Sequence, residues 1–321
     1  MKVRETKNEH FLTAFASAIG SKVEGGRVNI PGKYGKGYVF GYLLDHRIRL
    51  IIRNYEFKED VEIKRSDYSS ATNMIAITFQ NIIKESENSN HQNIGPRQLP
   101  SVVIATQGLD SDVYIPGNIS FNTLKLNVDA SYVRQLLGPD IDNALLKNII
   151  ENKQPLLFEQ FVSLKLEQIF AELIATRVEK SLHQFFYQVK SEEIVCYLLM
   201  ELTQRQERTT IQSINSEDAK NIYAARERLL KDLANPPTQD ELAAFANMSL
   251  SKLKRLFKQV YGQNVFQYFQ AVRMKEAAYF LKHKGMSVSE VGYALGFSNL
   301  SHFTRVFEAH TGIKPKKYSK I

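Results

Sequence analysis

The feature that most constrains this chain is a helical hairpin that occurs twice in its last third. A capping box starts each copy, at Thr238–Glu241 and at Ser287–Glu290. In such a box a Ser or Thr oxygen and a Glu three residues later each accept a free backbone N–H at the start of a helix. Behind each box the pattern predicts a short helix, a turn and a second helix that ends at Gly262 or Gly312. Two helices joined by a tight turn, and repeated once, predict paired helix-turn-helix units.

The two units align at a constant spacing after their turns. Matching residues are 50 apart: Arg255 with Arg305, Phe257 with Phe307, Gly262 with Gly312, and Tyr268 with Tyr318. Before the turns the spacing is 49, so the second turn should contain one extra residue. Apolar residues follow the helical period in both second helices, at Leu253, Leu256, Phe257 and Val260 and at Phe303, Val306 and Phe307. A duplicated hairpin that turns polar and basic residues away from such a stripe indicates DNA binding.

The charge distribution agrees with this interpretation. The whole chain has 42 Lys and Arg against 34 Asp and Glu, a net charge of +8. Residues 218–321 alone hold 17 basic and 8 acidic residues, a net charge of +9, and residues 1–217 have a net charge of −1. A solvated basic surface is the alternative, but this asymmetry favours a polyanionic partner, either nucleic acid or a membrane surface.

About 100 C-terminal residues also resemble the DNA-binding domain of the AraC/XylS family of bacterial transcription regulators. The matching positions are Leu242-Ala243, Ser249, Leu253, Arg255-Leu256-Phe257-Lys258, Gly262, Arg273, Ala277, Leu281, Gly296-Phe297-Ser298, Phe303, Arg305-Val306-Phe307, Gly312, Pro315 and Tyr318. One departure is Gly292, where the family usually has alanine. We interpret this glycine as making its helix less tightly packed and more flexible. The resemblance implies seven helices, the first over residues 218–234. It also implies a rigid linking helix over 265–282, which would hold the two recognition helices about one DNA turn (~34 Å) apart.

The inward stripe of each recognition helix predicts which residues face the major groove. The expected base-reading residues are Ser251, Lys254 and Arg255 in the first unit and Leu300, Ser301, Thr304 and Arg305 in the second. Arg and Lys donate to guanine O6 and N7, whereas Leu300 and the Thr304 methyl would contact thymine methyls. For any one of these positions the alternative is a phosphate contact or a solvated side chain. Expected phosphate contacts are Lys252, Lys258, Lys316 and Lys317. Arg273, between the units, is expected to be a structural ion-pair partner.

The first ~130 residues are predicted to be rich in strands, because apolar, aromatic and β-branched residues alternate there. The expected strands are 37–44, 48–57, 74–83, 102–106 and 119–128, with a turn at 45–47 and a polar loop at 85–93. Short strands at close spacing suggest a small barrel or sandwich. The family resemblance implies a cupin-like, effector-binding barrel. Aromatic residues in the strands (Tyr38, Phe40, Tyr42 and Phe79) would line the effector site or fill the core.

After Asp129, a predicted N-cap, the period becomes helical. We expect a short helix that ends at Gly138, a long amphipathic helix over 155–187 and another helix from Ser191. The stripe over 157–202 is too apolar to remain exposed, so these helices are expected to form a homodimer. The predicted fold class is therefore α+β. Residues 1–203 would form the effector-binding and dimerisation domain, 204–216 a linker, and 217–321 an all-α domain with two helix-turn-helix units.

Enzyme, metal and membrane classes are not expected. Tyr34 follows Gly32-Lys33, where a phosphate loop needs Ser or Thr. His10, His46 and His91 are scattered, so neither a metal nor a cofactor is predicted. The lone Cys196 should be a core residue in a reducing cytoplasm, and no apolar run is long enough to span a bilayer. Charged residues before Phe11–Ile19 argue against a secretory signal.

The sequence therefore predicts a cytoplasmic, sequence-specific regulator of transcription, most simply an activator, and not an enzyme. Its expected partners are double-stranded DNA, RNA polymerase, a second copy of the chain and a small-molecule effector on the N-terminal domain. One alternative is a regulator without a ligand, controlled by its abundance or by a protein partner. A second alternative is a cupin-type enzyme fused to a DNA-binding domain, which would need a metal and converging ligands.

Overall fold

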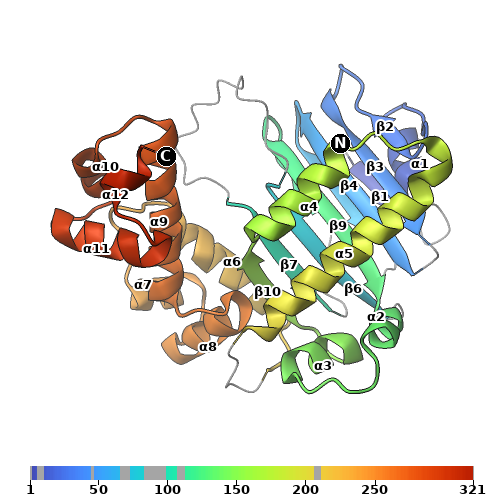
Figure 1. The fold of residues 1–321 in the computed structure, drawn as a ribbon. Coiled ribbons are helices and arrows are strands. Elements are labelled where there is room, and N and C mark those ends of the chain that lie inside the picture. The colour runs from blue at the N-terminus through green and yellow to red at the C-terminus, as the bar shows by residue number, and fades with distance from the viewer. Residues whose placement is uncertain are drawn as a thin grey trace. The chain divides into compact units, whose positions relative to one another are not determined.

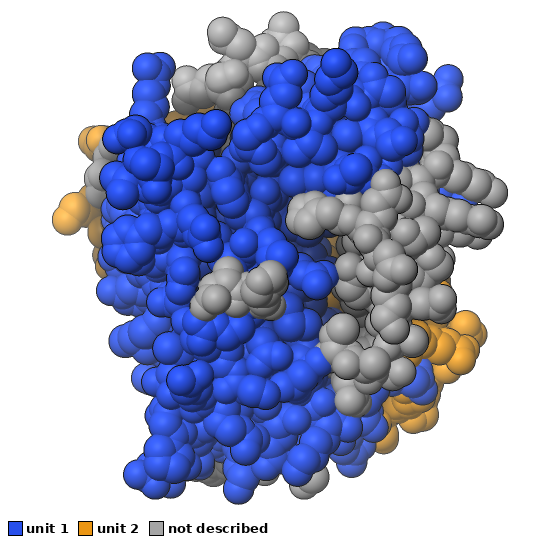
Figure 2. Space-filling view, turned by 90° about the vertical axis from the view of Figure 1, so that its right-hand side faces the viewer, with its two compact units in different colours: residues 1–89, 99–215 blue, residues 90–98, 216–321 orange. Residues whose placement is uncertain are grey.

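A computed structural model describes residues 2–5, 11–44, 47–65, 73–82, 99–106, 113–205 and 211–320. The chain forms two compact units, residues 1–89 with 99–215 and residues 90–98 with 216–321, which are coloured separately in Figure 2. Each unit is described on its own. No helix among the described residues is long and apolar enough to cross a membrane.

The first unit is built on an open, antiparallel, seven-stranded sheet. Its strands are β2 (Arg27–Asn29), β3 (Gly35–Leu44), β4 (Ile48–Phe57), β6 (Met74–Gln80), β7 (Ser101–Ala105), β9 (Ser120–Asp129) and β10 (Leu157–Phe161). They lie in the order β10-β7-β6-β9-β4-β3-β2. The long pairings of β4 with β3 and β9 form its centre, and Leu50 lies opposite both Tyr42 and Leu126.

A second, three-stranded sheet orders β1 (Lys2–Glu5), β5 (Val61–Arg65) and β8 (Val113–Ile115) as β1-β5-β8. A small apolar core joins it to α1 (Phe11–Ala18) and to one face of the large sheet. Phe15 lies at the centre of this core, with its ring centroid 6.4 Å from that of Tyr55 and 6.5 Å from that of Phe57. This core therefore covers the β3–β4 end of that face.

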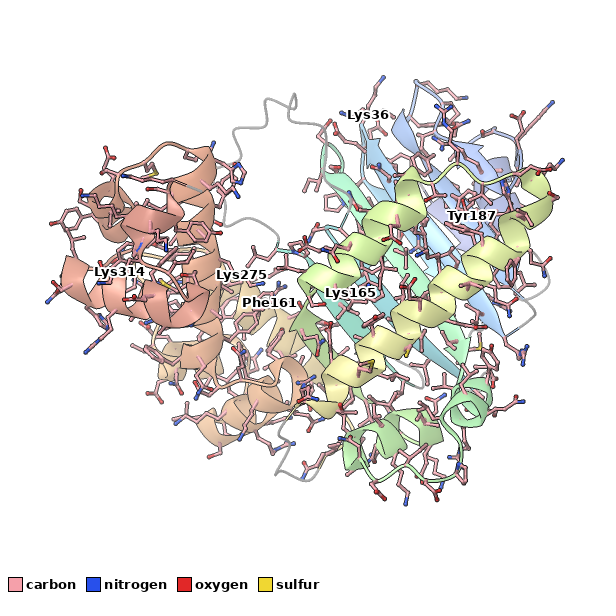
Figure 3. All side chains as sticks on the ribbon, in the orientation of Figure 1. Lys36, Phe161, Lys165, Tyr187, Lys275 and Lys314 are labelled. Atoms are coloured by element: carbon pink, nitrogen blue, oxygen red, sulfur yellow. The ribbon has the colours of Figure 1, made fainter. Side chains whose placement is uncertain are left out.

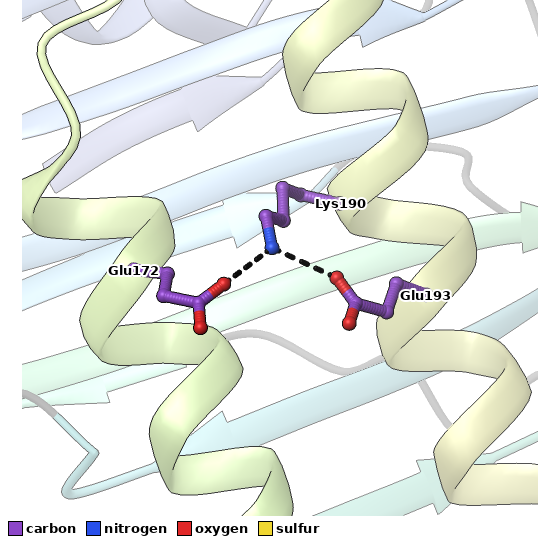
Figure 4. A network of polar contacts seen from close by, with 3 residues as sticks. All are labelled: Glu172, Lys190 and Glu193. Atoms are coloured by element: carbon purple, nitrogen blue, oxygen red, sulfur yellow. Dashed lines mark hydrogen bonds and ion pairs between the residues drawn. The ribbon is translucent and has the colours of Figure 1, made fainter.

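Helices cover the other face of the seven-stranded sheet, which we call the helical face. The helices are α2 (Ala130–Leu137), α3 (Ala144–Glu151), α4 (Leu164–Ala175) and α5 (His183–Thr203), with a 3-10 turn, η1 (Lys180–Leu182), before α5. In Figure 1, α4 and α5 run side by side across the sheet. Lys190 joins them, because its Nζ lies 2.6 Å from Glu172 Oε2 and 2.9 Å from Glu193 Oε2 (Figure 4). The hydrogen bond from Lys190 also lowers the pKa of the Glu172 carboxyl.

The five strands expected from the sequence are present, and α2 begins at its Asp129 cap and ends at Gly138 as predicted. The expected helix over 155–187 is partly wrong, because Leu157–Phe161 instead pairs with β7 as an edge strand. The cupin-like barrel is not confirmed: in the described part of the chain, the seven-stranded sheet has two open edges, β10 and β2. Asp45, His46 and the predicted loop 85–93 lie outside the described residues, as do His10 and His91.

Two further expectations concern the helical face. Phe79 is fully buried, with its ring centroid 4.6 Å from that of Phe170. Tyr42 packs under α5 instead, where its hydroxyl lies 2.8 Å from His183 Nδ1 and its ring stacks on that of Tyr187, the residue labelled on α5 in Figure 3. The prediction that Cys196 is a core residue is wrong, because its side chain is exposed. Neighbouring positions of α5, such as Val195, take the inward side of the helix.

The second unit is all-helical. It contains α6 (Ser216–Leu230), α7 (Gln239–Phe245), α8 (Leu250–Tyr261), α9 (Val265–His283), α10 (Val288–Ala294), α11 (Leu300–Thr311) and α12 (Pro315–Tyr318). These are the seven helices that the resemblance implied. The long helix α9 contacts α8 as well as α10, α11 and α12, so it connects the two helix-turn-helix units.

Candidate nucleic-acid interface

Both predicted capping boxes form, and they fix where each helix-turn-helix unit begins. Thr238 N–H donates to Glu241 Oε2 at 2.7 Å, and Glu241 N–H donates to Thr238 Oγ1 at 3.2 Å. The same pair of bonds joins Ser287 and Glu290, at 2.7 and 3.3 Å. Hydrogen bonds from the Thr238 backbone and hydroxyl lower the pKa of Glu241, and those from Ser287 lower the pKa of Glu290. Both carboxylates are therefore held in the charged form that caps the helix.

The recognition helices α8 and α11 also begin and end alike. Ser249 caps α8 through the Lys252 N–H, and Asn299 caps α11 through two backbone N–H groups. Gly262 and Gly312 end them at φ angles of 69° and 76°, in the left-handed region predicted for both. The sequence repeat therefore corresponds to a structural repeat, because α8 and α11 have equivalent caps at their first and last turns.

The cores behind the two helices repeat as well. The rings of Phe257 and Tyr268 meet edge to face with centroids 5.4 Å apart, and those of Phe307 and Tyr318, 50 residues later, do so at the same distance. Phe257 and Phe307 are both fully buried. Because these anchors are equivalent, they set α8 and α11 at equivalent rotations about their own axes, with the same helical positions facing outward.

The predicted base-reading residues fall mainly on these outward sides. Ser251, Lys254 and Arg255 are exposed on α8, and Ser301 and Arg305 are exposed on α11. Leu300 and Thr304 are half-buried. The structure therefore places Arg255 and Arg305 at equivalent, exposed positions of the two units. Their contacts with bases remain predictions.

Leu300 packs against Gly292, which corrects the interpretation of this glycine. A Cβ placed on Gly292 would lie 2.6 Å from Leu300 Cδ2 and 3.3 Å from Phe303 Cδ1. Gly292 is buried in α10, so its missing side chain makes room for Leu300 and does not loosen the helix. No local pattern in the sequence indicates this contact, because it depends on how α10 and α11 pack.

The predicted phosphate contacts differ in their surroundings. Lys258 is exposed on α8, and Lys316 and Lys317 are exposed on α12. Lys252 is half-buried and forms an ion pair with Asp218, the Nζ to Oδ1 distance being 2.8 Å. Asp218 lies in the first turn of α6. Lys252 is thus already paired with a carboxylate in the absence of DNA, and sequence spacing alone does not reveal a partner 34 residues away.

The two turns differ by the one residue that the spacing predicted. In the first turn Asn247 takes the left-handed conformation at φ 51°, and in the second Gly296 takes it at φ 77°. A side chain at Gly296 would collide with the loop between α6 and α7, since its Cβ would lie 2.7 Å from Ala234 Cα. The second turn therefore requires glycine both for its backbone conformation and for this close approach.

Arg273 of α9 is structural, as expected, but its main contacts are not ion pairs. Its guanidinium donates to the Leu295 carbonyl and to Gln270 Oε1, and it lies 4.0 Å from the ring centroid of Phe297. Burial lowers the pKa of this guanidinium to about 10, so it remains charged near neutral pH. Arg273 thereby attaches α9 to the second turn by hydrogen bonding and by a cation–π contact.

Among the described residues, no group of three or more His, Cys, Asp and Glu side chains could hold a metal ion. The arrangement offers instead two exposed, basic helix faces on one all-helical unit. The labelled Lys314 of Figure 3, just before α12, adds to its basic side chains.

Comparison with known proteins supports the same domain. Residues 242–321 match the family model described as a helix-turn-helix domain. Over 94 residues the chain is 30% identical to the HTH-type transcriptional activator RhaR of Escherichia coli (strain K12) and to that of Shigella flexneri serotype 5b (strain 8401). Each match covers 29% of this chain and 33% of the relative, so the chain spans about a third of the length of these relatives.

A solved structure of a transcriptional regulator from Chromobacterium violaceum, described as containing an AraC-type DNA-binding domain, is also similar. It is 26% identical, the similarity covers 33% of this chain and 95% of that chain, and the TM-score is 0.31. Residues 242–321 of the chain are therefore similar to the helix-turn-helix domain of transcription regulators such as RhaR.

Proposed function

We propose that this protein is a sequence-specific regulator of transcription that binds double-stranded DNA through α8 and α11. The observation that carries the proposal is the duplicated placement of Arg255 and Arg305, which are exposed at equivalent positions of two helices with matching caps and matching aromatic anchors. An exposed arginine on such a helix can donate two parallel hydrogen bonds to one guanine.

Around these two positions we assign Ser251, Lys254, Leu300, Ser301 and Thr304 to the base edges. We assign Lys258, Lys316 and Lys317 to phosphates, because their charges are exposed on α8 and α12. Lys252 joins them when DNA phosphate competes with Asp218 for its ammonium group. The net charge of +9 over residues 218–321 supports a polyanionic partner.

For the first unit we propose control by a small-molecule effector. Residues 204–216 would be the link through which it acts, and binding would shift an existing equilibrium between states of the chain. The activator role follows the similarity to RhaR, which is described as a transcriptional activator, and implies RNA polymerase as a partner. We place this activity in the cytoplasm, and we assign the protein no enzymatic reaction.

We propose that the chain forms a homodimer through the outward side of the region 157–202. The inward stripe of α4 and α5, with Phe170 and Leu198 among its members, is buried against the sheet. The outward side of α5 still carries large apolar residues, with Phe185 69% exposed and Met200 56% exposed. This outward side is the surface that we assign to the second copy of the chain.

The test of DNA reading is competition binding against operator variants with single base changes. Arg255→Ala and Arg305→Ala should each cost about 1–3 kcal/mol on the specific site and relax the preference at one base pair only. Lys258→Ala is the control, because loss of a phosphate contact weakens specific and nonspecific binding alike. If both arginine variants retain the base preference of the wild type at every position, the assignment of the reading faces is wrong.

A further inference from the structure

The ion pair between Lys252 and Asp218 places a carboxylate against the recognition helix α8. Lys252 lies on α8 between Ser251 and Lys254, two of the residues that we assign to base edges. Its Nζ lies 2.8 Å from Asp218 Oδ1, and the side chains of the lysine and the aspartate are 39% and 16% exposed, respectively. An ammonium group assigned to phosphate is thus neutralised, before DNA is present, by a residue of a different helix.

This pair distinguishes α8 from α11. The position equivalent to Lys252, 50 residues later, holds His302, which is exposed on α11. The ring of His302 packs edge to face against that of Phe297, with the centroids 5.7 Å apart. Equivalent positions of the two recognition helices therefore have different neighbours, a carboxylate in the first helix-turn-helix unit and an aromatic ring in the second.

The body of α6 is held in place by contacts other than this ion pair. Ile222 is fully buried, and Arg226 Nε donates to the Tyr268 hydroxyl of α9 at 2.8 Å. Residues 215–217, by contrast, are exposed, so Asp218 lies at the less packed end of the helix. Such helix ends open more readily than the packed part of a helix. Separation of the pair can therefore loosen the first turn of α6 while the rest of the helix stays folded.

The first turn of α6 is also where the chain enters the second compact unit. Ile214 belongs to the first compact unit, where it is 1% exposed and its N–H donates to the Pro155 carbonyl at 2.9 Å. Since α6 begins at Ser216, a single residue, Asn215, separates this attachment from the helix. A change in how Ile214 is held therefore acts directly on the turn that carries Asp218.

The ion pair and a phosphate contact exclude one another, because both use the same ammonium group. A phosphate that binds Lys252 must replace the carboxylate, so the affinity for DNA is lowered by the strength of the pair. Because partly exposed pairs are weak, the reduction is about fivefold at most. Asp218 also makes other interactions within the protein, so its carboxylate keeps partners when the lysine leaves. Binding competition is reciprocal, so bound DNA weakens the pair to the same extent.

We propose that Asp218 is an inhibitory residue of the DNA-binding unit. Its carboxylate competes with phosphate for Lys252 and keeps the affinity for DNA below the value that the basic side chains alone would give. When DNA binds, Lys252 turns to a phosphate and the first turn of α6, next to Ile214, is loosened. This inference rests on the proposed DNA binding, and it adds a control of affinity that leaves the base-reading residues unchanged.

The experiment measures the affinity of the full chain for a DNA duplex of random sequence at low salt, by fluorescence anisotropy. Asp218→Asn should raise this affinity about fivefold, because the competing charge is removed. Glu217→Gln is the matched control, since it removes the same charge from an exposed position of the same turn, and should change the affinity less than about twofold. In a Lys252→Met background, Asp218→Asn should have no more effect than Glu217→Gln, because the contested ammonium group is absent.

Hydrogen exchange of the full chain tests the coupling to α6. The amides of residues 220–222 donate to the carbonyls of the first turn, as in any α-helix. Addition of the duplex should make these amides exchange faster in the wild type. In Asp218→Asn they should already exchange fast without DNA and change little when it is added. Unchanged exchange in the wild type would overturn the coupling between DNA binding and the first turn.

The inhibitory role is overturned if Asp218→Asn raises the affinity no more than Glu217→Gln does, or if its effect persists in the Lys252→Met background. If Asp218→Asn fails to fold, Lys252→Met alone decides. It should weaken binding less than Lys258→Met, because Lys258 is exposed on α8, and an equal loss would overturn the inference. A wild-type chain that binds no duplex at any salt concentration would contradict the proposed function itself, whereas the other outcomes leave that function intact.

Discussion

Replacing Gly292 by alanine should reveal how tightly the second helix-turn-helix unit is packed. In an open helix, alanine in place of glycine stabilises by about 1 kcal/mol. Here the new Cβ would lie 2.6 Å from Leu300 Cδ2, so the Leu300 side chain would have to shift, whereas its distance of 3.3 Å from Phe303 Cδ1 requires an adjustment of only a few tenths of an ångström. Overpacking of this kind costs about 1–3 kcal/mol. We therefore expect Gly292→Ala to destabilise the unit by about 1 kcal/mol.

The second half of the experiment removes the Leu300 side chain, which the new Cβ would otherwise contact too closely. With Leu300→Ala already present, Gly292→Ala should stabilise by about 1 kcal/mol, which makes the coupling between the two sites about 2 kcal/mol. The assay is urea unfolding of residues 213–321 followed by circular dichroism, because the chain has no tryptophan. Ala243→Gly, the equivalent site of the first unit, should lose about 1 kcal/mol whether or not Leu300 is present. A coupling below about 0.5 kcal/mol between positions 292 and 300 would refute the packing argument.

Three further predictions concern the same unit. The affinity for DNA should fall steeply with salt, log K changing by about 0.9 per log unit of salt for each phosphate contacted, and a flat response between low and physiological salt would contradict a phosphate-binding surface. Residues 213–321 should fold alone and bind DNA with reduced affinity, which circular dichroism and gel-shift assays check; an unfolded fragment would place the boundary elsewhere. Glu241 and Glu290 have folded pKa values below 4.5, so their contribution to stability is present above pH 4.5 and is lost as the pH falls through the lower folded values. Urea unfolding of Glu290→Gln should therefore differ from the wild type near neutral pH and converge with it in acid.

What could be predicted from the sequence depends on how local each signal is. The two helical hairpins of the second unit are specified by caps, glycines and apolar spacing within single helices, whereas its seven helices were implied by the family resemblance. Leu157–Phe161 is different: an apolar run of this length suits a helix or a strand, and pairing with β7, about 50 residues earlier, makes it a strand. The open edges of the sheet and the outward position of Cys196 likewise follow from non-local packing.

Within the candidate interface, too, local features are predictable from the sequence and non-local contacts are not. Exposure of Arg255 and Arg305 follows from the helical period, because the apolar positions of each helix are visible in the sequence. The Asp218 partner of Lys252 depends on how α6 meets α8. In the proposed interface, a phosphate would have to compete with a carboxylate for Lys252 and would gain less from it than from the exposed Lys258.

The extra residue of the second turn explains why the two units are not interchangeable. Three consecutive residues of this turn contact other parts of the domain: Leu295 accepts from Arg273, Gly296 approaches Ala234, and Phe297 lies beneath the Arg273 guanidinium. The lengthened turn is therefore attached both to α9 and to the loop after α6. Because α11 begins three residues after Phe297, these contacts also set where the second recognition helix starts. The orientation of the second helix is thus fixed by contacts that have no counterpart in the sequence repeat, whereas its exposed face is fixed by the repeat itself.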